Sequence, residues 1–219
     1  MKEYIFFGDS ITSGENNNFK SYVDYLKLDG HITNNGVSGT TFGRYSLYPV
    51  NDSSLETLLE GTNPQEATNT TIFISFGPND CSSACLKYTT STKILIDFVR
   101  CIDAIRQKFK GCEIIFLGIS LNYSKLTDIA QNQHDYLKLL YFEYIQSELN
   151  FKNFVHEWIL NYYLICKTAA KLCDGFYIML PSDFDMIADM DNDKLHPNDE
   201  GYQKIAKKLN QELKSYLTF

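Results

Sequence analysis

A continuous apolar run stops abruptly near the start of the chain, in the stretch Phe6-Phe7-Gly8-Asp9-Ser10-Ile11-Thr12-Ser13-Gly14. Residues 4–7 have the uninterrupted apolar character of a strand that is buried on both faces, as in a parallel sheet. A glycine, an acid and a serine follow at once, so the strand is predicted to end there. Because ligands bind beyond the carboxyl ends of the strands in an open parallel sheet, these polar residues are candidate site residues.

Short strand-like runs and longer helical runs alternate along the rest of the chain. The predicted strands span 4–7, 32–37, 72–76, 114–117 and 151–155, and the predicted helices span 19–28, 92–109, 134–149 and 200–216. Helices between buried strands predict a parallel sheet with right-handed crossovers, covered by a helical layer on each face. We therefore expect a single three-layer α/β/α domain over residues 1–219, with irregular segments at 40–69, 81–91, 120–132 and 180–198.

The composition disfavours polyanionic partners. The chain has 219 residues, with 20 Lys and Arg against 27 Asp and Glu, which gives a net charge of -7. A negative protein is not attracted non-specifically to nucleic acid or to an anionic membrane surface. No apolar stretch approaches the roughly 20 residues that cross a bilayer, and no secretory signal is visible, which predicts a cytoplasmic protein.

The six cysteines do not form a metal-binding pattern. They include no CxxC pair, and no histidine lies at zinc-ligand spacing from any of them, so we expect no metal site. Reduced and mostly buried thiols are expected in the cytosol. Cys81 and Cys85 are close enough in sequence to form a disulfide in an oxidised sample, and the sequence leaves that alternative open.

Polar residues also follow the other predicted strands. Ser38-Gly39-Thr40 lies beyond the strand at 32–37, and Gly77-Pro78-Asn79-Asp80 follows the strand at 72–76. Far downstream, Asp193-Lys194-Leu195-His196-Pro197 precedes the last helix. These segments are predicted to meet at one edge of the sheet.

Such a set of residues fits acyl transfer. A serine hydroxyl is a weak nucleophile until a base takes its proton. Only His196 lies in a polar loop with an acid three residues before it, and Asp193 would fix its tautomer so that the other ring nitrogen faces Ser10. The remaining histidines adjoin predicted strands or a predicted helix: His31, His134 and His156. The backbone N–H groups of Ser10 and Gly39 and the side-chain amide of Asn79 could stabilise the developing oxyanion.

Taken together, the four segments resemble the SGNH hydrolases, also called the GDSL esterase/lipase family, whose sequence blocks carry Ser, Gly, Asn and His in this order. The resemblance extends from Tyr4 to the terminal helix. It implies a flavodoxin-like fold with a five-stranded parallel sheet, and hydrolysis of O-acyl esters through an acyl-enzyme without a cofactor. It departs from the family pattern at Ile11, where the family name has leucine, and at Pro78, where glycine is frequent.

The resemblance also implies roles for particular residues. Ser10 would be the nucleophile, His196 the general base and Asp193 the residue that orients it, with Asp191 as the alternative acid. Ser10, Gly39 and Asn79 would form the oxyanion hole. Other polar residues near these blocks are expected to be structural: Asp9, Ser13 and Asp80. Arg44 could meet an acidic substrate group or lie in solvent, and four tyrosines could line a pocket or pack in loops: Tyr45, Tyr48, Tyr88 and Tyr123.

The leading hypothesis for function is a serine esterase that removes a small O-acyl group from a small molecule, such as an acetyl ester on a carbohydrate. The same residues would also serve a thioesterase, a lysophospholipase or an acyltransferase. A non-catalytic ligand-binding module that kept the fold is a third hypothesis. The sequence does not indicate an oligomeric state.

Overall fold

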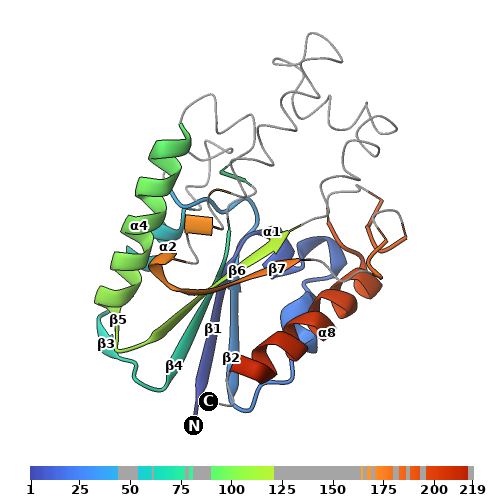
Figure 1. Ribbon diagram of the computed structural model, residues 1–219, viewed down its shortest axis with the longest axis horizontal. Coiled ribbons are helices and arrows are strands. Elements are labelled where there is room, and N and C mark those ends of the chain that lie inside the picture. The colour runs from blue at the N-terminus through green and yellow to red at the C-terminus, as the bar shows by residue number, and fades with distance from the viewer. Residues whose placement is uncertain are drawn as a thin grey trace.

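A computed structural model describes residues 1–43, 54–60, 62–76, 79–80, 90–120, 164, 167–168, 171–179, 183–185, 188–192 and 196–216. Within them, one sheet of five strands has the order β2-β1-β4-β6-β7 (Figure 1). Every neighbouring pair in this sheet is parallel. The strands are β1 (Glu3–Gly8), β2 (His31–Gly36), β4 (Thr70–Ser75), β6 (Glu113–Ser120) and β7 (Asp174–Met179). The predicted α/β class with a parallel sheet is confirmed.

The centre of the sheet is built from the most apolar strands. All six residues of β4 are buried, whereas β2 at the sheet edge has none that is fully buried. The rings of Phe6 on β1 and Phe73 on β4 stack with centroids 4.4 Å apart. Burial of aromatic side chains is a dominant favourable term in folding, so this pair helps to fix the register of β1 against β4.

Helices cover both faces of the sheet (Figure 1). On one side, α4 (Ser91–Lys108) packs against α2 (Leu55–Glu60), and on the other side α8 (Asp199–Tyr216) packs against the short 3-10 helix η2 (Tyr22–Tyr25). Thr90 caps α4, because its side-chain oxygen accepts a hydrogen bond from the N–H of Lys93 at 3.2 Å. The helices predicted at 92–109 and 200–216 are thus confirmed within one residue at each end.

The helix predicted at 19–28 is wrong. Only the four residues of η2 are helical there, in a 3-10 turn. Ser21 and Asp24 form a capping box that starts this turn, and Leu26 is already extended, with φ -73° and ψ 142°. The chain must leave the turn early to reach β2, and Asn210 on α8 holds it by accepting from the Lys27 N–H at 2.7 Å.

Two further expectations need correction. The segment 40–69 was expected to be irregular, but it contains α2 and the short strand β3 (Gln65–Glu66), which pairs with β5 (Phe109–Lys110). The strand β7 beside β6 was not predicted. The strand predicted at 151–155 and the helix predicted at 134–149 lie outside the described residues.

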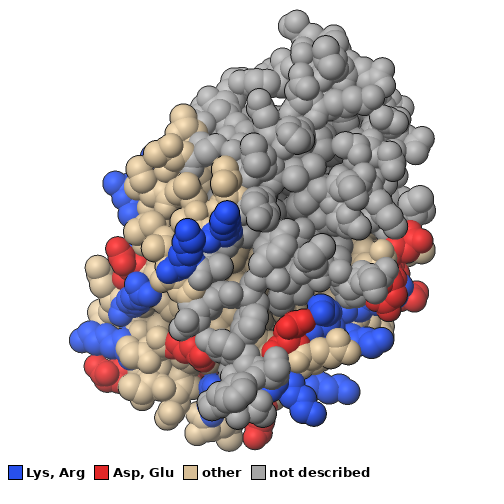
Figure 2. All heavy atoms as spheres, in the orientation of Figure 1, with Lys and Arg blue, Asp and Glu red and all other residues tan. Residues whose placement is uncertain are grey.

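Acidic and basic side chains are interspersed over the described part of the surface in Figure 2. Several form pairs along one helix, such as Lys93 with Asp97 at 2.6 Å on α4 and Lys208 with Glu212 at 2.7 Å on α8. Among the described residues, none of the helices is both long and apolar enough to cross a membrane.

Candidate active site

Ser10 is placed by the turn from β1 into the short helix α1 (Ser10–Ser13), which follows the carboxyl end of the strand (Figure 1). Asp9 is buried and caps this helix, because its Oδ1 accepts a hydrogen bond from the Ile11 N–H at 3.0 Å. Gly14 ends the helix with a positive φ of 69°. The structural role predicted for Asp9 is therefore confirmed, and Ser10 stands at the first position of the helix.

His196 meets Ser10 across 186 residues of sequence. The Nε2 atom of its ring lies 2.7 Å from the Ser10 Oγ. The histidine loop is braced by the backbone bond from the Asp191 N–H to the His196 carbonyl at 2.8 Å. Below it, the buried Asp189 carboxylate pairs with Lys204 on α8 at 2.8 Å. A serine hydroxyl within hydrogen-bond reach of a braced imidazole is the geometry that nucleophilic catalysis needs.

The segments that carry Gly39 and Asn79 are joined to each other by hydrogen bonds. Gly39 has a positive φ of 73°, a conformation that favours glycine and turns its backbone away from the path of β2. The Asn79 Nδ2 donates to the Thr40 carbonyl at 3.1 Å. A carboxamide carries two N–H groups, and this bond occupies one of them. The buried Asp80 accepts from the Phe42 N–H at 2.8 Å, which ties the two segments together.

Two further predicted residues have local structural contacts. The Ser13 Oγ donates to the Ser10 carbonyl at 3.1 Å, as expected of a residue that only supports the turn. The Asp191 Oδ1 accepts from the neighbouring Asn192 N–H at 2.7 Å. The predicted orienting acid, Asp193, lies outside the described residues, as do Arg44 and the four tyrosines.

Sequence reasoning did not find the contacts of Asn16 and Gly36. The Asn16 Nδ2 lies 2.7 Å from the His196 Nδ1. The two residues are 180 positions apart, and no motif in the sequence pairs them. Gly36 ends β2 directly against the backbone of α1, where an added Cβ would come within 2.4 Å of the Ser13 nitrogen.

Substitution of Gly36 by alanine is expected to destabilise the protein and to displace the helix α1 that carries Ser10. The clash is with backbone, so it cannot be relieved by rotation of a side chain, and overpacking of this kind costs about 1–3 kcal/mol. Urea denaturation would measure the loss, and esterase assays would show a lower kcat. A Gly36→Ala variant with wild-type stability and activity would contradict the close approach of Gly36 to the backbone of α1.

Burial raises the pKa of the Asp9 carboxyl to about 6, although the hydrogen bond from the Ile11 N–H and the nearby His196 oppose the shift. The unfolded chain loses this proton near its ordinary pKa of about 3.9. Between these two values the folded state holds a proton that the unfolded state has lost, so stability falls as the pH rises. The charged Asp9 carboxylate therefore lowers the free energy of unfolding at neutral pH.

We expect the Asp9→Asn variant to lose this pH dependence. Asparagine keeps an oxygen that can cap α1 but does not titrate. The free energy of unfolding of the wild type should fall relative to the variant by about 2–3 kcal/mol between about pH 4 and pH 7. Urea denaturation of both proteins at each pH measures the difference. The contributions of the other titrating groups are the same in both proteins and therefore cancel. Parallel pH profiles would show that Asp9 is not buried in its protonated form.

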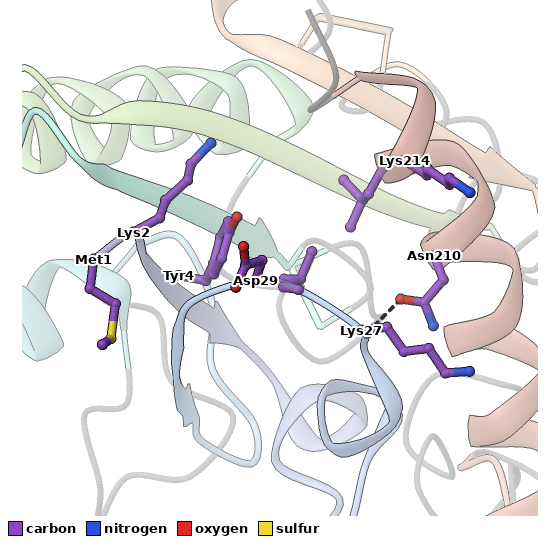
Figure 3. Close-up of a pocket in the computed structure, with 9 residues that line it drawn as sticks. Met1, Lys2, Tyr4, Lys27, Asp29, Asn210 and Lys214 are labelled. Atoms are coloured by element: carbon purple, nitrogen blue, oxygen red, sulfur yellow. Dashed lines mark hydrogen bonds between the residues drawn. The ribbon is translucent and has the colours of Figure 1, made fainter.

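A cavity of about 750 Å³ lies elsewhere, beyond the amino end of β1 (Figure 3). Lys2 reaches it from just before β1, Tyr4 from β1, Asp29 from the loop before β2, and Asn210 and Lys214 from α8. The described residues that line it include no serine, histidine or cysteine, so it does not share the chemistry of the Ser10 site.

No group of three or more potential metal ligands occurs among the described side chains. Among the described cysteines, Cys101 and Cys112 are free thiols, and Cys81 and Cys85 lie outside the described ranges.

Known proteins resemble this chain in family and in fold. A model of the GDSL-like lipase/acylhydrolase family matches residues 6–204. The search of curated proteins gave no match. Among solved structures, the psychrotrophic esterase EstA from Pseudoalteromonas sp. is 16% identical, with 100% of each chain covered and a TM-score of 0.53. A family 3 carbohydrate esterase from Clostridium thermocellum is 15% identical over 96% of this chain and 94% of the other, with a TM-score of 0.54. A lipase/acylhydrolase from Enterococcus faecalis is 17% identical over 99% and 97%, with a TM-score of 0.50.

Proposed function

Because this chain belongs to the GDSL-like lipase/acylhydrolase family and is a carboxylic ester hydrolase, we propose that it cleaves short O-acyl esters, above all acetyl esters, with Ser10 as nucleophile. The single observation that carries the proposal is the 2.7 Å contact between the Ser10 Oγ and the His196 Nε2. It joins two segments from opposite ends of the chain at the carboxyl end of β1.

In the proposed reaction, the Ser10 Oγ attacks the ester carbonyl while its proton passes to the His196 Nε2. The carbonyl oxygen becomes an oxyanion, which the N–H groups of Ser10, Gly39 and Asn79 stabilise. The tetrahedral intermediate collapses, and the alcohol leaves with the proton from His196. A water molecule then gives a proton to His196 and attacks the acyl-enzyme, and as the acid leaves, His196 returns that proton to the Ser10 Oγ and restores the hydroxyl. Asp193 is proposed to orient His196 throughout.

An acetylated carbohydrate is our proposed substrate class. A carbohydrate esterase is among the solved structures to which the chain is similar, which supports this choice at the level of the fold. The two long described helices, α4 and α8, both pack on the sheet and are not free to lie on a lipid surface. A soluble ester with a short acyl group is therefore favoured over a long-chain lipid.

The test is a comparison of p-nitrophenyl acetate with p-nitrophenyl decanoate, followed by acetylated sugars and an acetyl thioester, with Ser10→Ala as the control. We expect kcat/KM for the acetyl ester to exceed that for the decanoyl ester by about tenfold or more, because a site shaped for a short acyl group excludes the longer chain and a single methylene already changes discrimination by about that factor. A preference for the decanoyl ester would favour a lysophospholipase, and a preference for the thioester would favour a thioesterase.

A further inference from the structure

Both ring nitrogens of His196 are engaged by side chains from the first twenty residues of the chain. The Nε2 atom lies 2.7 Å from the Ser10 Oγ, and the Nδ1 atom lies 2.7 Å from the Asn16 carboxamide. Ser10 and Asn16 are separated by only the short helix α1 and the turn at Gly14. The imidazole is therefore held between two polar groups that one local segment supplies.

The segment that carries Asn16 has a defined backbone. Asn16 is the middle residue of the 3-10 turn η1 (Glu15–Asn17), which is closed by the bond from the Asn17 N–H to the Gly14 carbonyl at 2.9 Å. Asn18 and Phe19 follow with positive φ values of 53° and 60°. Such a conformation is costly for residues other than glycine and persists only where surrounding contacts hold it.

Those contacts come from the same helix that carries the histidine loop. Asp199, the first residue of α8, lies three positions after His196 and accepts a hydrogen bond from the Asn17 Nδ2 at 3.2 Å and one from the Tyr25 hydroxyl. Lys20 pairs with the same carboxylate at 3.5 Å. The η1 segment and His196 thus share one anchor, so the distance between Asn16 and the imidazole is set by the fold.

We propose that Asn16 is a positioning residue for the catalytic histidine, an inference that rests on the proposed function of Ser10 and His196. For Nε2 to take the serine proton, Nδ1 must carry the ring hydrogen and donate it to an acceptor. A half-turn of the Asn16 carboxamide presents its Oδ1 at the position where the Nδ2 now lies, and Oδ1 accepts that hydrogen. With the Nδ2 towards the ring, Nδ1 accepts and the ring hydrogen sits on Nε2, which cannot then act as a base. The carboxamide orientation therefore selects the tautomer.

This role is distinct from that of the predicted acid. Asp193 would orient the ring and also stabilise the imidazolium by its charge, whereas Asn16 is neutral and contributes to ring orientation and tautomer without a charge. If Asp193 alone held the ring, the loss of the Asn16 carboxamide would leave the rate unchanged. The two contributions can therefore be separated by substitution.

The experiment compares wild type with Asn16→Ala, Asn16→Asp and Asn210→Ala on p-nitrophenyl acetate. Because Asn16 acts on the base rather than on the substrate, Asn16→Ala should lower kcat by about 10–100-fold, with KM changed by less than about threefold. Asn16→Asp keeps an acceptor and adds a charge that favours the imidazolium, so it should recover most of kcat and move the acid limb of the kcat/KM profile to higher pH. The buried Asp9 carboxyl near His196 is common to all four proteins.

Asn210→Ala is the matched control. Its carboxamide also makes two hydrogen bonds, with the Lys27 N–H and the Tyr25 carbonyl, but at the cavity end of α8. It should lower the Tm and leave kcat and the pH profile unchanged. Asn16→Ala with wild-type kcat, or a loss that Asn16→Asp does not recover, would overturn the inference while Ser10→Ala stays inactive. Activity that survives in Ser10→Ala would instead overturn the proposed function.

Discussion

The Ser10→Ala variant is expected to lose esterase activity almost completely while it folds normally. Removal of a nucleophile that works with a base lowers kcat by about 10⁴-fold or more, because the covalent route is closed. The Ser10 side chain makes its contact with His196 in a partly exposed position, so its loss should change stability by less than about 1 kcal/mol. Hydrolysis of p-nitrophenyl acetate and a urea denaturation curve measure the two effects.

Ser13→Ala is the control for this variant. Ser13 lies on the same short helix, and its hydroxyl donates to the Ser10 carbonyl at 3.1 Å without contact with the histidine in the described structure. Its loss removes this hydrogen bond and the one that the hydroxyl accepts from the Glu15 N–H at 3.3 Å, each worth about 1 kcal/mol of stability, and should leave kcat within a few-fold of wild type. If Ser13→Ala were inactive and Ser10→Ala active, the assignment of the nucleophile would be wrong.

The Asn79→Ala variant is expected to show the second largest loss of activity. One N–H of the carboxamide donates to the Thr40 carbonyl, and the other is proposed to bind the oxyanion. Removal of one such donor lowers kcat by about 10²–10³-fold, because the negative charge on the oxygen develops only in the transition state. KM should change little, since the ground-state carbonyl binds the donor weakly. Steady-state kinetics with p-nitrophenyl acetate provide both values.

Asn34→Ala separates a catalytic loss from a structural one. The Asn34 Nδ2 likewise donates to a backbone carbonyl of the site's scaffold, that of Thr12 at 2.8 Å, but it is not a proposed oxyanion donor. We expect it to lower stability and to keep kcat within a few-fold of wild type. If both asparagine variants lost stability equally and neither lost kcat, Asn79 would only hold the loop at Thr40.

The sequence was sufficient to predict the parallel α/β fold and the convergence of Ser10 with His196. Strands such as β4 are buried on both faces and so appear as continuous apolar runs, and the residues after them must lie at the same sheet edge. The Ser and His blocks could be matched because each sits at a strand or helix boundary. Sequence patterns therefore predicted the residues whose positions depend only on where strands and helices begin and end.

The errors have a common physical origin in contacts between distant segments. The helix expected at 19–28 had suitable apolar spacing, but the chain is pulled into an extended path by Asn210 on α8. The constraint on Gly36 likewise comes from a different segment, the backbone of α1. Asn16 is one of three consecutive asparagines, and only the folded position of His196 distinguishes it from its neighbours.

The most direct test of the central claim is the rate at which a fluorophosphonate labels the folded protein, followed by peptide mapping in wild type and in His196→Gln. A serine activated by its neighbouring imidazole should take up one phosphonyl group per chain, on Ser10. General-base assistance is worth about 10²–10⁴-fold, so labelling of His196→Gln should be slower by at least the lower factor. Labelling at another residue, or at Ser10 with equal rates in both proteins, would contradict the proposal that these two side chains act together.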